Sequence, residues 1–334
     1  MRLQGHSVSL YAGNVGPNEV EAEVFDDLNG NRIDSLSRTV SPIKDIKAVF
    51  ELRKTLKSVN ADVINTHTFK AGLIGRLANM GLPTKVVHTY HGHLLYGYLS
   101  PMKSKIYIIL ERILGSLTDV FIAVGRNVQS ELLNQGIGST KKFRVIYPAI
   151  RELIFTNGAT LRKMYGFAEE DFVIGWLGRF TSIKQPSLFL ELAVMNPGLK
   201  FLIGGDGELK NDLLVNLPVN VSYVGWVKPE DFWPACNVGV LTSANEGLPT
   251  SVIEAQQAAI PSVAFNVGSV SEVIISDFTG YLVKDLNEFC EKIISLKENS
   301  ELADRLGLQA KEYSRTHFNK DIFIDKHLEL YANL

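Results

Sequence analysis

The chain is poor in cysteine, lacks long hydrophobic runs and carries no excess of basic residues. Its 334 residues include two cysteines, Cys236 and Cys290, too few for a disulfide scaffold or a cysteine-based zinc site. Apolar runs such as Ile106–Leu110 fall far below the roughly 18 residues of a membrane-spanning helix. Lysine and arginine number 34 against 36 aspartate and glutamate residues, so no basic field for nucleic acid exists. No secretory signal is visible at the start, and we expect a reduced, cytoplasmic protein that binds no nucleic acid.

Short β-branched runs alternate with amphipathic stretches along nearly the whole chain. The clearest helix is Pro42–Val59, in which apolar residues recur every three or four positions and a proline suits the first turn. One series of alternating elements ends at Tyr147, a second begins at Val173, and three helical stretches follow from Leu286. This alternation predicts parallel sheets covered on both faces. At roughly 150 residues per domain, we expect two Rossmann-like α/β domains joined by a linker within Pro148–Glu169.

The predicted strands are short and rich in β-branched residues. In chain order they are His6–Tyr11, Asp62–Asn65, Val86–Tyr90, Val120–Val124, Phe143–Tyr147, Val173–Leu177, Lys200–Gly204, Val221–Val224, Val238–Leu241, Ser262–Phe265 and Gly280–Val283. Among the predicted helices, Glu230–Ala235 and Val270–Ser276 lie between strands of the second series. Such sheets bind ligands beyond the carboxyl ends of their strands, so polar residues at those ends are the candidates for a binding site.

Two glutamates eight positions apart, Glu246 and Glu254, follow the strand Val238–Leu241 in the segment NEGLPTSVIE. Pro249 fits the first turn of a helix, which places Glu246 in the loop at the sheet edge and Glu254 about a turn and a half into the helix. Backbone N–H groups near Leu248–Ser251 then form an anion site, strengthened by the helix dipole. An acidic first turn that stabilises its own helix is the alternative for this segment alone.

Two cations, Arg179 and Lys184, follow the strand that ends at Gly178. At the carboxyl edge of a sheet they could hold a diphosphate, arginine through its planar fork and lysine as a point charge. Two solvated surface cations are the alternative. In the first series His91 follows a strand, and since no carboxylate or thiol pattern accompanies it, no metal site is predicted.

Taken together, these segments resemble the retaining nucleotide-sugar glycosyltransferases of glycosyltransferase family 4, whose GT-B fold sets two Rossmann-like domains face to face across a cleft. The most specific part is the spacing of Glu246 and Glu254 after Gly178, Arg179 and Lys184. The order HTFKAGLIGR, HTYHGH, ERILGSLTD and VIYPAI is similar to bacterial members that build surface polysaccharide.

The resemblance implies a division of the chain and an activity. Residues 1–155 would form the acceptor-side domain, 156–315 the nucleotide-sugar domain, and 316–334 a helix that crosses back. The expected reaction moves a sugar from a nucleotide-sugar, for which we expect UDP, to a polysaccharide or lipid-linked saccharide with retention of configuration. A non-catalytic remnant that still binds nucleotide-sugar and a UDP-sugar 2-epimerase of the same fold are the alternatives.

The resemblance also assigns roles to single residues. His91 would lie beside the reacting sugar and Glu246 would face the donor sugar, the two as catalytic residues, while Glu254 would hold the ribose. The other donor-binding residues would be Arg179 and Lys184, at the diphosphate, and Gly247, Leu248, Pro249 and Thr250, whose backbone lines the sugar and phosphate site. No metal or other cofactor is implied, because the cations and the helix N-terminus supply the electrostatic stabilisation.

Three departures from the family pattern stand out. The family's first strand and glycine-rich loop have no counterpart before Gly5, and Met1–Gln4 resembles a helix tail, so the chain is expected to be truncated at its N-terminus. Ala259 stands where a glycine usually ends the helix, and a left-handed alanine there would cost about 1 kcal/mol. Ser271 replaces a usual proline, which only softens a helix start.

One amphipathic segment raises the question of a membrane. Residues 103–117, KSKIYIILERILGSL, set Lys103, Lys105 and Arg112 beside isoleucines and leucines. We favour an ordinary core helix, and an interfacial helix that contacts the inner membrane near a lipid-linked acceptor is the alternative.

Overall fold

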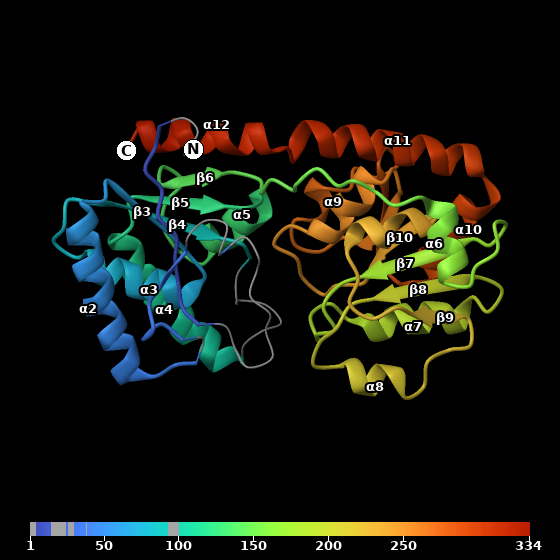
Figure 1. Cartoon of the computed structure of the whole chain (residues 1–334), viewed down its shortest axis with the longest axis horizontal. Coiled ribbons are helices and arrows are strands. Elements are labelled where there is room, and N and C mark those ends of the chain that lie inside the picture. The colour runs from blue at the N-terminus through green and yellow to red at the C-terminus, as the bar shows by residue number, and fades with distance from the viewer. Residues whose placement is uncertain (1–4, 15–24, 26–29, 38, 93–99) are drawn as a thin grey trace.

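The computed structural model describes residues 5–14, 25, 30–37, 39–92 and 100–334. Two α/β domains lie side by side, and two C-terminal helices run along one edge of both (Figure 1). These helices are α11 (Ser300–His317) and α12 (Lys320–Ala332), and the C-terminus lies on the N-terminal domain. The two predicted parallel-sheet domains are therefore confirmed. Met1–Gln4, predicted as a helix tail, lie outside the described residues.

The N-terminal domain is built on a parallel sheet with the strand order β3-β4-β5-β6. The predicted strand His6–Tyr11 is wrong in extent, since only β1 (Tyr11–Ala12) forms a strand, which pairs with β2 (Asn31–Arg32) outside that sheet. The main elements are β3 (Val63–His67), β4 (Lys85–Tyr90), β5 (Val120–Ala123), β6 (Phe143–Val145), α2 (Pro42–Val59), α3 (Phe69–Asn79), α4 (Pro101–Ser116) and α5 (Arg126–Asn134).

The C-terminal domain has a larger parallel sheet with the order β12-β11-β10-β7-β8-β9. The chain runs outward from β7 through β8 to β9 and then returns to the other side of β7 with β10, so the strand order reverses between β7 and β10. A reversal of this kind opens a crevice beyond the carboxyl ends of the two strands, where ligands bind. The strands are β7 (Val173–Leu177), β8 (Lys200–Gly204), β9 (Val221–Tyr223), β10 (Val238–Leu241), β11 (Ser262–Phe265) and β12 (Gly280–Val283).

Two predicted helices of this domain reduce to short 3₁₀ turns. Glu230–Ala235 becomes η2 (Pro229–Asp231) and η3 (Trp233–Ala235), because a proline in each turn lacks the N–H that a continuous helix needs. Val270–Ser276 becomes η4 (Val270–Glu272), after which Ser276 pairs with Gly280 in a β-bridge. The remaining helices are α6 (Gly158–Met164, within the predicted linker), α7 (Pro186–Met195), α8 (Lys210–Leu214), α9 (Thr250–Gln257) and α10 (Leu286–Glu298).

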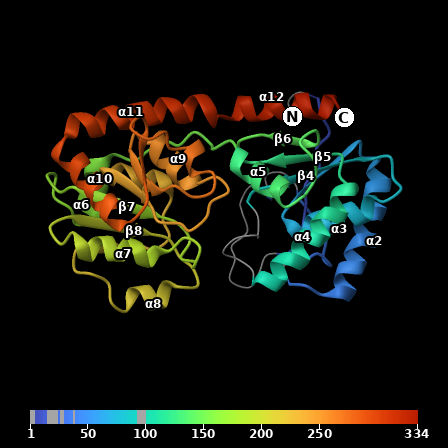
Figure 2. The same cartoon turned by 180° about the vertical axis from the view of Figure 1, so that it is seen from behind.

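The chain crosses between the domains twice at one place. The first crossing follows β6 and the second joins α11 to α12, and Ile150 N–H donates to the carbonyl of Phe318 at 3.0 Å where they meet. Beyond it α12 lies along the N-terminal domain (Figure 2). Leu330 joins the cluster of Val87 and Ile122 under the sheet, and the side-chain amide of Asn65 donates to the Tyr331 hydroxyl at 2.8 Å. The last helix therefore belongs to the first domain in space.

Candidate active site

An acid and a base meet at the point where the C-terminal strand order reverses. Lys184 lies in the loop after β7 and Glu246 in the loop after β10, and their side chains form an ion pair with Nζ and Oε1 2.6 Å apart. The Ser243 hydroxyl donates to the same oxygen at 2.6 Å, and Glu246 is buried. Arg179 is exposed in the same loop as Lys184. Three charged residues that the sequence analysis singled out are thus placed at one sheet edge.

The two loops are held in register by hydrogen bonds to each other. Ala244 N–H donates to the carbonyl of Ile183 at 2.8 Å, and the Thr242 hydroxyl donates to the carbonyl of Lys184 at 3.0 Å. Thr242 in turn accepts from the buried indole N–H of Trp176 at 3.0 Å. The positions of the charged side chains are therefore set by the ends of two neighbouring strands and their buried core.

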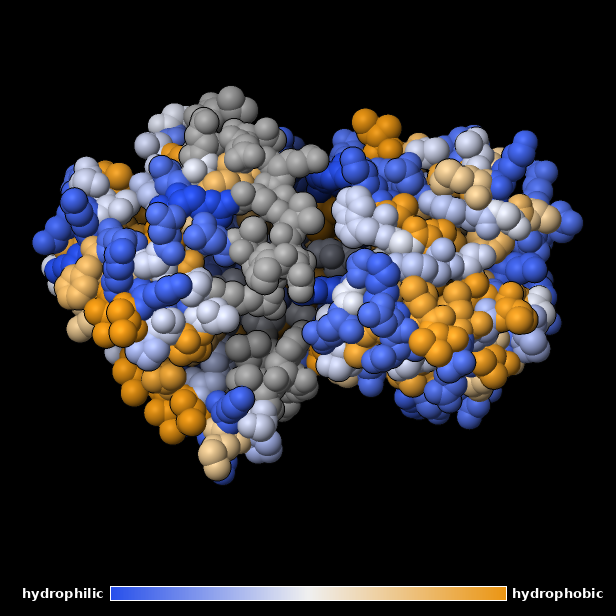
Figure 3. All heavy atoms as spheres, turned by 60° about the horizontal axis from the view of Figure 1, so that its bottom comes forward, coloured by the Kyte–Doolittle hydropathy of each residue, from blue (hydrophilic) through white to orange (hydrophobic). Residues whose placement is uncertain are grey.

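The N-terminal domain reaches this site through His91 and Gly92, which follow β4. A Cβ atom added to Gly247 would overlap the carbonyl oxygen of His91, and the Gly247 Cα lies 3.6 Å from where a Cβ of Gly92 would stand. Only glycine lets the two backbones approach so closely. The predicted catalytic residue His91 and the Glu246–Gly247 loop are consequently brought together from opposite domains. The space-filling view shows a hollow between the two domains (Figure 3).

His91 has a partner that sequence reasoning did not assign. The ring nitrogens His67 Nδ1 and His91 Nε2 lie 2.8 Å apart, and the two rings are stacked with centroids 5.0 Å apart. Burial, with smaller contributions from His91 and His327, lowers the pKa of His67 to about 4, and burial also lowers the pKa of His91. The lowered pKa values favour the neutral form of both imidazoles at pH 7. The signal in the sequence was that both histidines lie at the carboxyl ends of neighbouring parallel strands, His67 as the last residue of β3 and His91 just after β4.

Glu254 lies on α9 among groups that the sequence analysis missed. Burial and then the carboxylate of Glu230 raise the pKa of Glu254 to about 7, while the positive charges of Arg151 and Lys184 act in the opposite direction. Arg151 pairs with Glu230. Within the described part of the chain, the buried Trp233 Nε1 and Glu230 Oε2 atoms have no hydrogen-bond partner. Glu230 was expected only as the first residue of a predicted helix, so nothing in the sequence pattern indicated this cluster.

The segment between the two glutamates leads into α9. Leu248 and Pro249 are buried, Thr250 is exposed, and Pro249 is the N-cap rather than the first helical residue. The first backbone N–H groups of α9 therefore lie at the carboxyl edge of β10, where the anion site was predicted. At its other end Ala259 has φ 60°, which confirms the predicted left-handed alanine.

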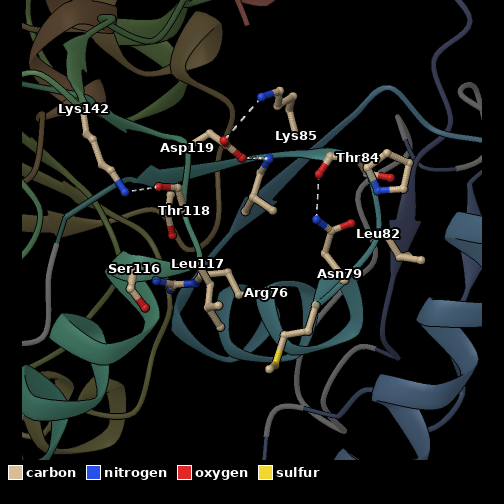
Figure 4. A pocket seen from close by; sticks show the side chains of 14 residues that line it. Arg76, Asn79, Leu82, Thr84, Lys85, Ser116, Leu117, Thr118, Asp119 and Lys142 are labelled. Carbon is tan, nitrogen blue, oxygen red and sulfur yellow. Dashed lines mark hydrogen bonds and ion pairs between the residues drawn. The ribbon is translucent and has the colours of Figure 1, made fainter.

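A cavity of about 390 Å³ lies elsewhere, at the opposite edge of the N-terminal sheet (Figure 4). Its polar residues already bond to neighbours: Asn79 donates to the Thr84 carbonyl at 2.7 Å, Lys142 to the Thr118 carbonyl at 2.7 Å, and Asp119 accepts from a backbone N–H. The cavity contains none of the predicted site residues. Across the described ranges, no group of three or more His, Cys, Asp or Glu side chains could hold a metal ion, and the absence of a metal stays a prediction.

Two glycosyltransferase families together match most of the chain, one in each domain. Glycosyltransferase Family 4 matches residues 1–152, and Glycosyl transferases group 1 matches residues 158–313. The chain belongs to the glycosyltransferases. The predicted glycosyltransferase family and the assignment as a sugar-transferring enzyme are thereby confirmed, while retention of configuration and the N-terminal truncation stay predictions.

Relatives of this glycosyltransferase are found in bacterial polysaccharide biosynthesis. The UDP-Gal:alpha-D-GlcNAc-diphosphoundecaprenol alpha-1,3-galactosyltransferase of Escherichia coli is 27% identical over an alignment of 323 residues, and the match covers 90% of this chain and 83% of that protein. The capsular polysaccharide biosynthesis glycosyltransferase CapM of Staphylococcus aureus is 22% identical, with 89% of this chain and 83% of the relative covered.

Solved structures agree on the fold. HepE of Anabaena in complex with UDP-glucose has a TM-score of 0.81 at 20% identity, over 93% of this chain and 88% of that one. Sucrose-phosphate synthase from Thermosynechococcus elongatus has a TM-score of 0.85 at 20% identity, over 99% and 90%. The predicted GT-B architecture of this glycosyltransferase is confirmed.

Proposed function

We propose that this glycosyltransferase moves a sugar from a UDP-sugar to a lipid-linked saccharide with retention of anomeric configuration. The observation that carries the proposal is the placement of Lys184 and Glu246 at the strand-order reversal, directly against the His91–Gly92 backbone of the other domain. A donor bound in the crevice would have its sugar at the junction of the two domains, where an acceptor held by the N-terminal domain can reach it.

The charged groups fit the parts of a nucleotide-sugar. Arg179 and Lys184, with the N-terminus of α9, would stabilise the diphosphate as negative charge develops on the leaving group. Glu254 would accept hydrogen bonds from the ribose hydroxyls. Glu246 serves as a positioning residue for the sugar, since retention in this family is usually explained without an enzymic nucleophile. Neutral His91 can donate or accept one hydrogen bond at the sugar.

The donor and acceptor are supported by the relatives. The Escherichia coli galactosyltransferase is named for UDP-Gal and for an acceptor carried on diphosphoundecaprenol, and HepE was solved with UDP-glucose. Since the family is shared and the charged site suits any nucleoside diphosphate, a UDP-sugar and a lipid-linked saccharide are the substrates we assign.

A lipid-linked acceptor suits contact with the cytoplasmic face of the membrane, and α4 offers a surface for it. The preferred expectation of a core helix is only half right: Leu114 is buried, but Ile106, Ile109 and Ile113 are 54%, 55% and 59% exposed. Lys103 and Lys105 lie on the same helix, a combination typical of interfacial helices. None of the helices in the described part of the chain could span a membrane.

Vesicle sedimentation tests the membrane contact. The wild type should bind vesicles containing an anionic lipid at low salt, and an Ile106→Asp, Ile109→Asp variant should bind several-fold less. Equal sedimentation of the two proteins would remove α4 as the contact. A neutral vesicle serves as the control for the charge dependence.

Calorimetry and a transfer assay test the activity. Arg179→Ala and Lys184→Ala should each weaken UDP binding about tenfold or more, since loss of a charge-assisted hydrogen bond costs roughly 1.5–3 kcal/mol. The matched controls Arg315→Ala and Lys297→Ala lie on α11 and α10 and should bind UDP normally. Unchanged affinity in both site variants would reject the diphosphate assignment.

The transfer assay separates the alternatives. The chain is given UDP-galactose, UDP-glucose or UDP-N-acetylglucosamine with a lipid-linked N-acetylglucosamine diphosphate, and the new linkage is examined by NMR. An α-linked product from an α-linked donor supports retention. UDP release with sugar epimerisation and no acceptor identifies a 2-epimerase, and UDP binding without turnover of any donor identifies a non-catalytic remnant.

A further inference from the structure

A carboxylate of the C-terminal domain caps a helix of the N-terminal domain. Glu272, in η4, accepts hydrogen bonds from the backbone N–H groups of Arg126 at 2.7 Å and Asn127 at 2.9 Å, the first two residues of α5. The Tyr147 hydroxyl, also from the N-terminal domain, donates to the same carboxylate at 2.9 Å. One side chain therefore receives three hydrogen bonds across the domain interface.

The local sequence of α5 makes this cap necessary. The first N–H groups of a helix have no partner within the helix, and a side chain at the N-cap normally supplies one. Here the N-cap is Gly125, which has no side chain, and a Cβ there would overlap the Ser269 hydroxyl of the other domain. The negative charge of Glu272 also lies at the positive end of the helix dipole. The cap of α5 is thus supplied by the Glu272 carboxylate of the C-terminal domain.

The other end of the same short segment holds the candidate active site. Ser269 N–H donates to the carbonyl of Glu246 at 3.1 Å, and a Cβ on Gly268 would overlap that same carbonyl. The Asn127 side chain donates to the Gly268 carbonyl. Residues 268–272 therefore touch the Glu246 backbone on one side and the start of α5 on the other.

We propose that Glu272 is a positioning residue for sugar transfer, which docks α5 onto the C-terminal domain and so sets His91 against the Glu246–Gly247 loop. This inference rests on the proposed function for its catalytic consequence. α5 follows β5, the parallel neighbour of β4, and the His91 segment follows β4, so a fixed α5 fixes the edge from which His91 projects. A hydrophobic cluster that includes Val128 of α5 and Val270 of η4 surrounds the contact.

Donor binding should be independent of this contact. The residues assigned to donor binding lie in loops and on α9 of the C-terminal domain, whereas the Glu272 carboxylate accepts its three hydrogen bonds from the N-terminal domain. Loss of the carboxylate should therefore slow the transfer step while leaving the donor's binding groups in place. This separation distinguishes a positioning role from general destabilisation.

The test compares Glu272→Ala, Glu272→Gln and Tyr147→Phe with the control Glu312→Ala, an exposed glutamate paired with Arg315 on α11. For Glu272→Ala we expect kcat to fall at least tenfold, with the KM for UDP-sugar and the Kd for UDP within twofold of the wild type. The kcat of Glu272→Gln, which keeps one acceptor oxygen, should lie between those of Glu272→Ala and the wild type. Tyr147→Phe should lose no more than a few-fold, and Glu312→Ala should be unchanged.

Hydrogen exchange gives a readout that needs no turnover. Amides in a peptide covering residues 125–134 should exchange faster in Glu272→Ala, while peptides of β7 and β8 keep their protection. Normal protection of α5, or a kcat equal to the wild type's, would overturn the inference. If the wild type itself transfers no sugar, the proposed function fails, and the exchange experiment still decides whether Glu272 docks α5.

Discussion

The two domains of this glycosyltransferase are stabilised inside by different chemistry. The C-terminal core is apolar and aromatic, with Trp176, Phe189 and Phe201 fully buried around its sheet. The N-terminal core contains a fully buried ion pair, in which Arg76 of α3 meets both carboxylate oxygens of Glu111 of α4 at 2.9 and 3.0 Å. The stability of the N-terminal domain therefore depends on the pairing of buried charged groups, whereas the stability of the C-terminal domain depends on the packing of apolar side chains.

The polar network of the N-terminal domain extends to the strand that carries the site. The Tyr90 hydroxyl donates to Glu111 at 2.6 Å, and burial followed by the charge of Glu111 raises the pKa of Tyr90 well above its ordinary value. His88, on the same strand, bonds to Thr66 of β3 at 2.8 Å. Because Tyr90 immediately precedes His91, we infer that these buried bonds fix the end of β4 where the two domains meet.

The largest effect is expected from breaking the buried ion pair. Glu111→Ala leaves Arg76 charged and unpaired in the core, which should cost about 3–5 kcal/mol. All three tryptophans, Trp176, Trp226 and Trp233, lie in the C-terminal domain, so their fluorescence reports that domain while circular dichroism reports both. The dichroism transition in urea should move to much lower concentration than the fluorescence transition.

A double variant provides the control for this prediction. Replacing Arg76 and Glu111 together by methionine removes both charges, and an apolar pair of similar volume is often as stable as the ion pair. Most of the lost stability should return. Parallel shifts of both transitions in Glu111→Ala would show that the two domains unfold as one unit, which would remove the contrast between them.

A smaller effect, on the rate of transfer, is expected where the backbones of the two domains are in contact. Gly247→Ala places a methyl group against the His91 carbonyl, so the two backbones must separate by a fraction of an ångström or more. Misplacement by about 1 Å can cost on the order of 100-fold in rate, and we expect a loss of transfer of that size. The matched control is Gly198→Ala, where a Cβ meets nothing within 4 Å. Full activity in Gly247→Ala would mean that the contact is absent during turnover.

A third effect concerns the raised pKa of Glu254. Its folded pKa of about 7 lies above the ordinary 4.5, so the carboxyl favours the neutral form in the fold, and that contribution to stability is complete below 4.5 and lost as the pH rises through 7. Ribose hydroxyls would donate to the ionised form. UDP-sugar affinity should therefore increase about tenfold between pH 6 and 8.

Glu254→Gln should bind a UDP-sugar more weakly and with little dependence on pH. Calorimetry with a UDP-sugar is preferred to UDP, since a diphosphate esterified at both ends does not titrate in this range. If the affinity of the wild type does not change between pH 6 and 8, Glu254 does not bind the donor.

The smallest effect is expected at the end of α9. Ala259 is left-handed, with φ 60°, and glycine adopts this region without the steric cost of a Cβ. Ala259→Gly should raise stability by up to about 0.5 kcal/mol, because the relief of about 1 kcal/mol is partly offset by the larger chain entropy of unfolded glycine. Tryptophan fluorescence in urea measures it, and Ala258→Gly, at φ −78°, should lower stability instead. A loss of stability in Ala259→Gly would show that the methyl group packs usefully.

Local patterns were sufficient for most of the elements. The apolar spacing and leading proline predicted Pro42–Val59 to the residue, and the strands Val173–Leu177 and Gly280–Val283 also have their predicted bounds. Predictions were wrong where another effect overrides the local pattern. In Glu230–Ala235, for example, an internal proline breaks the predicted helix into 3₁₀ turns. Periodicity records which face of an element is buried, and it does so without knowledge of the neighbours.

Some features of the candidate site were likewise predictable from the sequence, and others were not. The sequence by itself determined that Arg179, Lys184 and Glu246 lie in loops at the carboxyl edge of one sheet, because parallel strands place their ends together. Only the tertiary structure decided that Lys184 pairs with Glu246, that His67 bonds to His91, and that a cap for α5 comes from the other domain. Those contacts join residues 24 to 146 positions apart, and a spacing along the chain carries no information about distances of that kind.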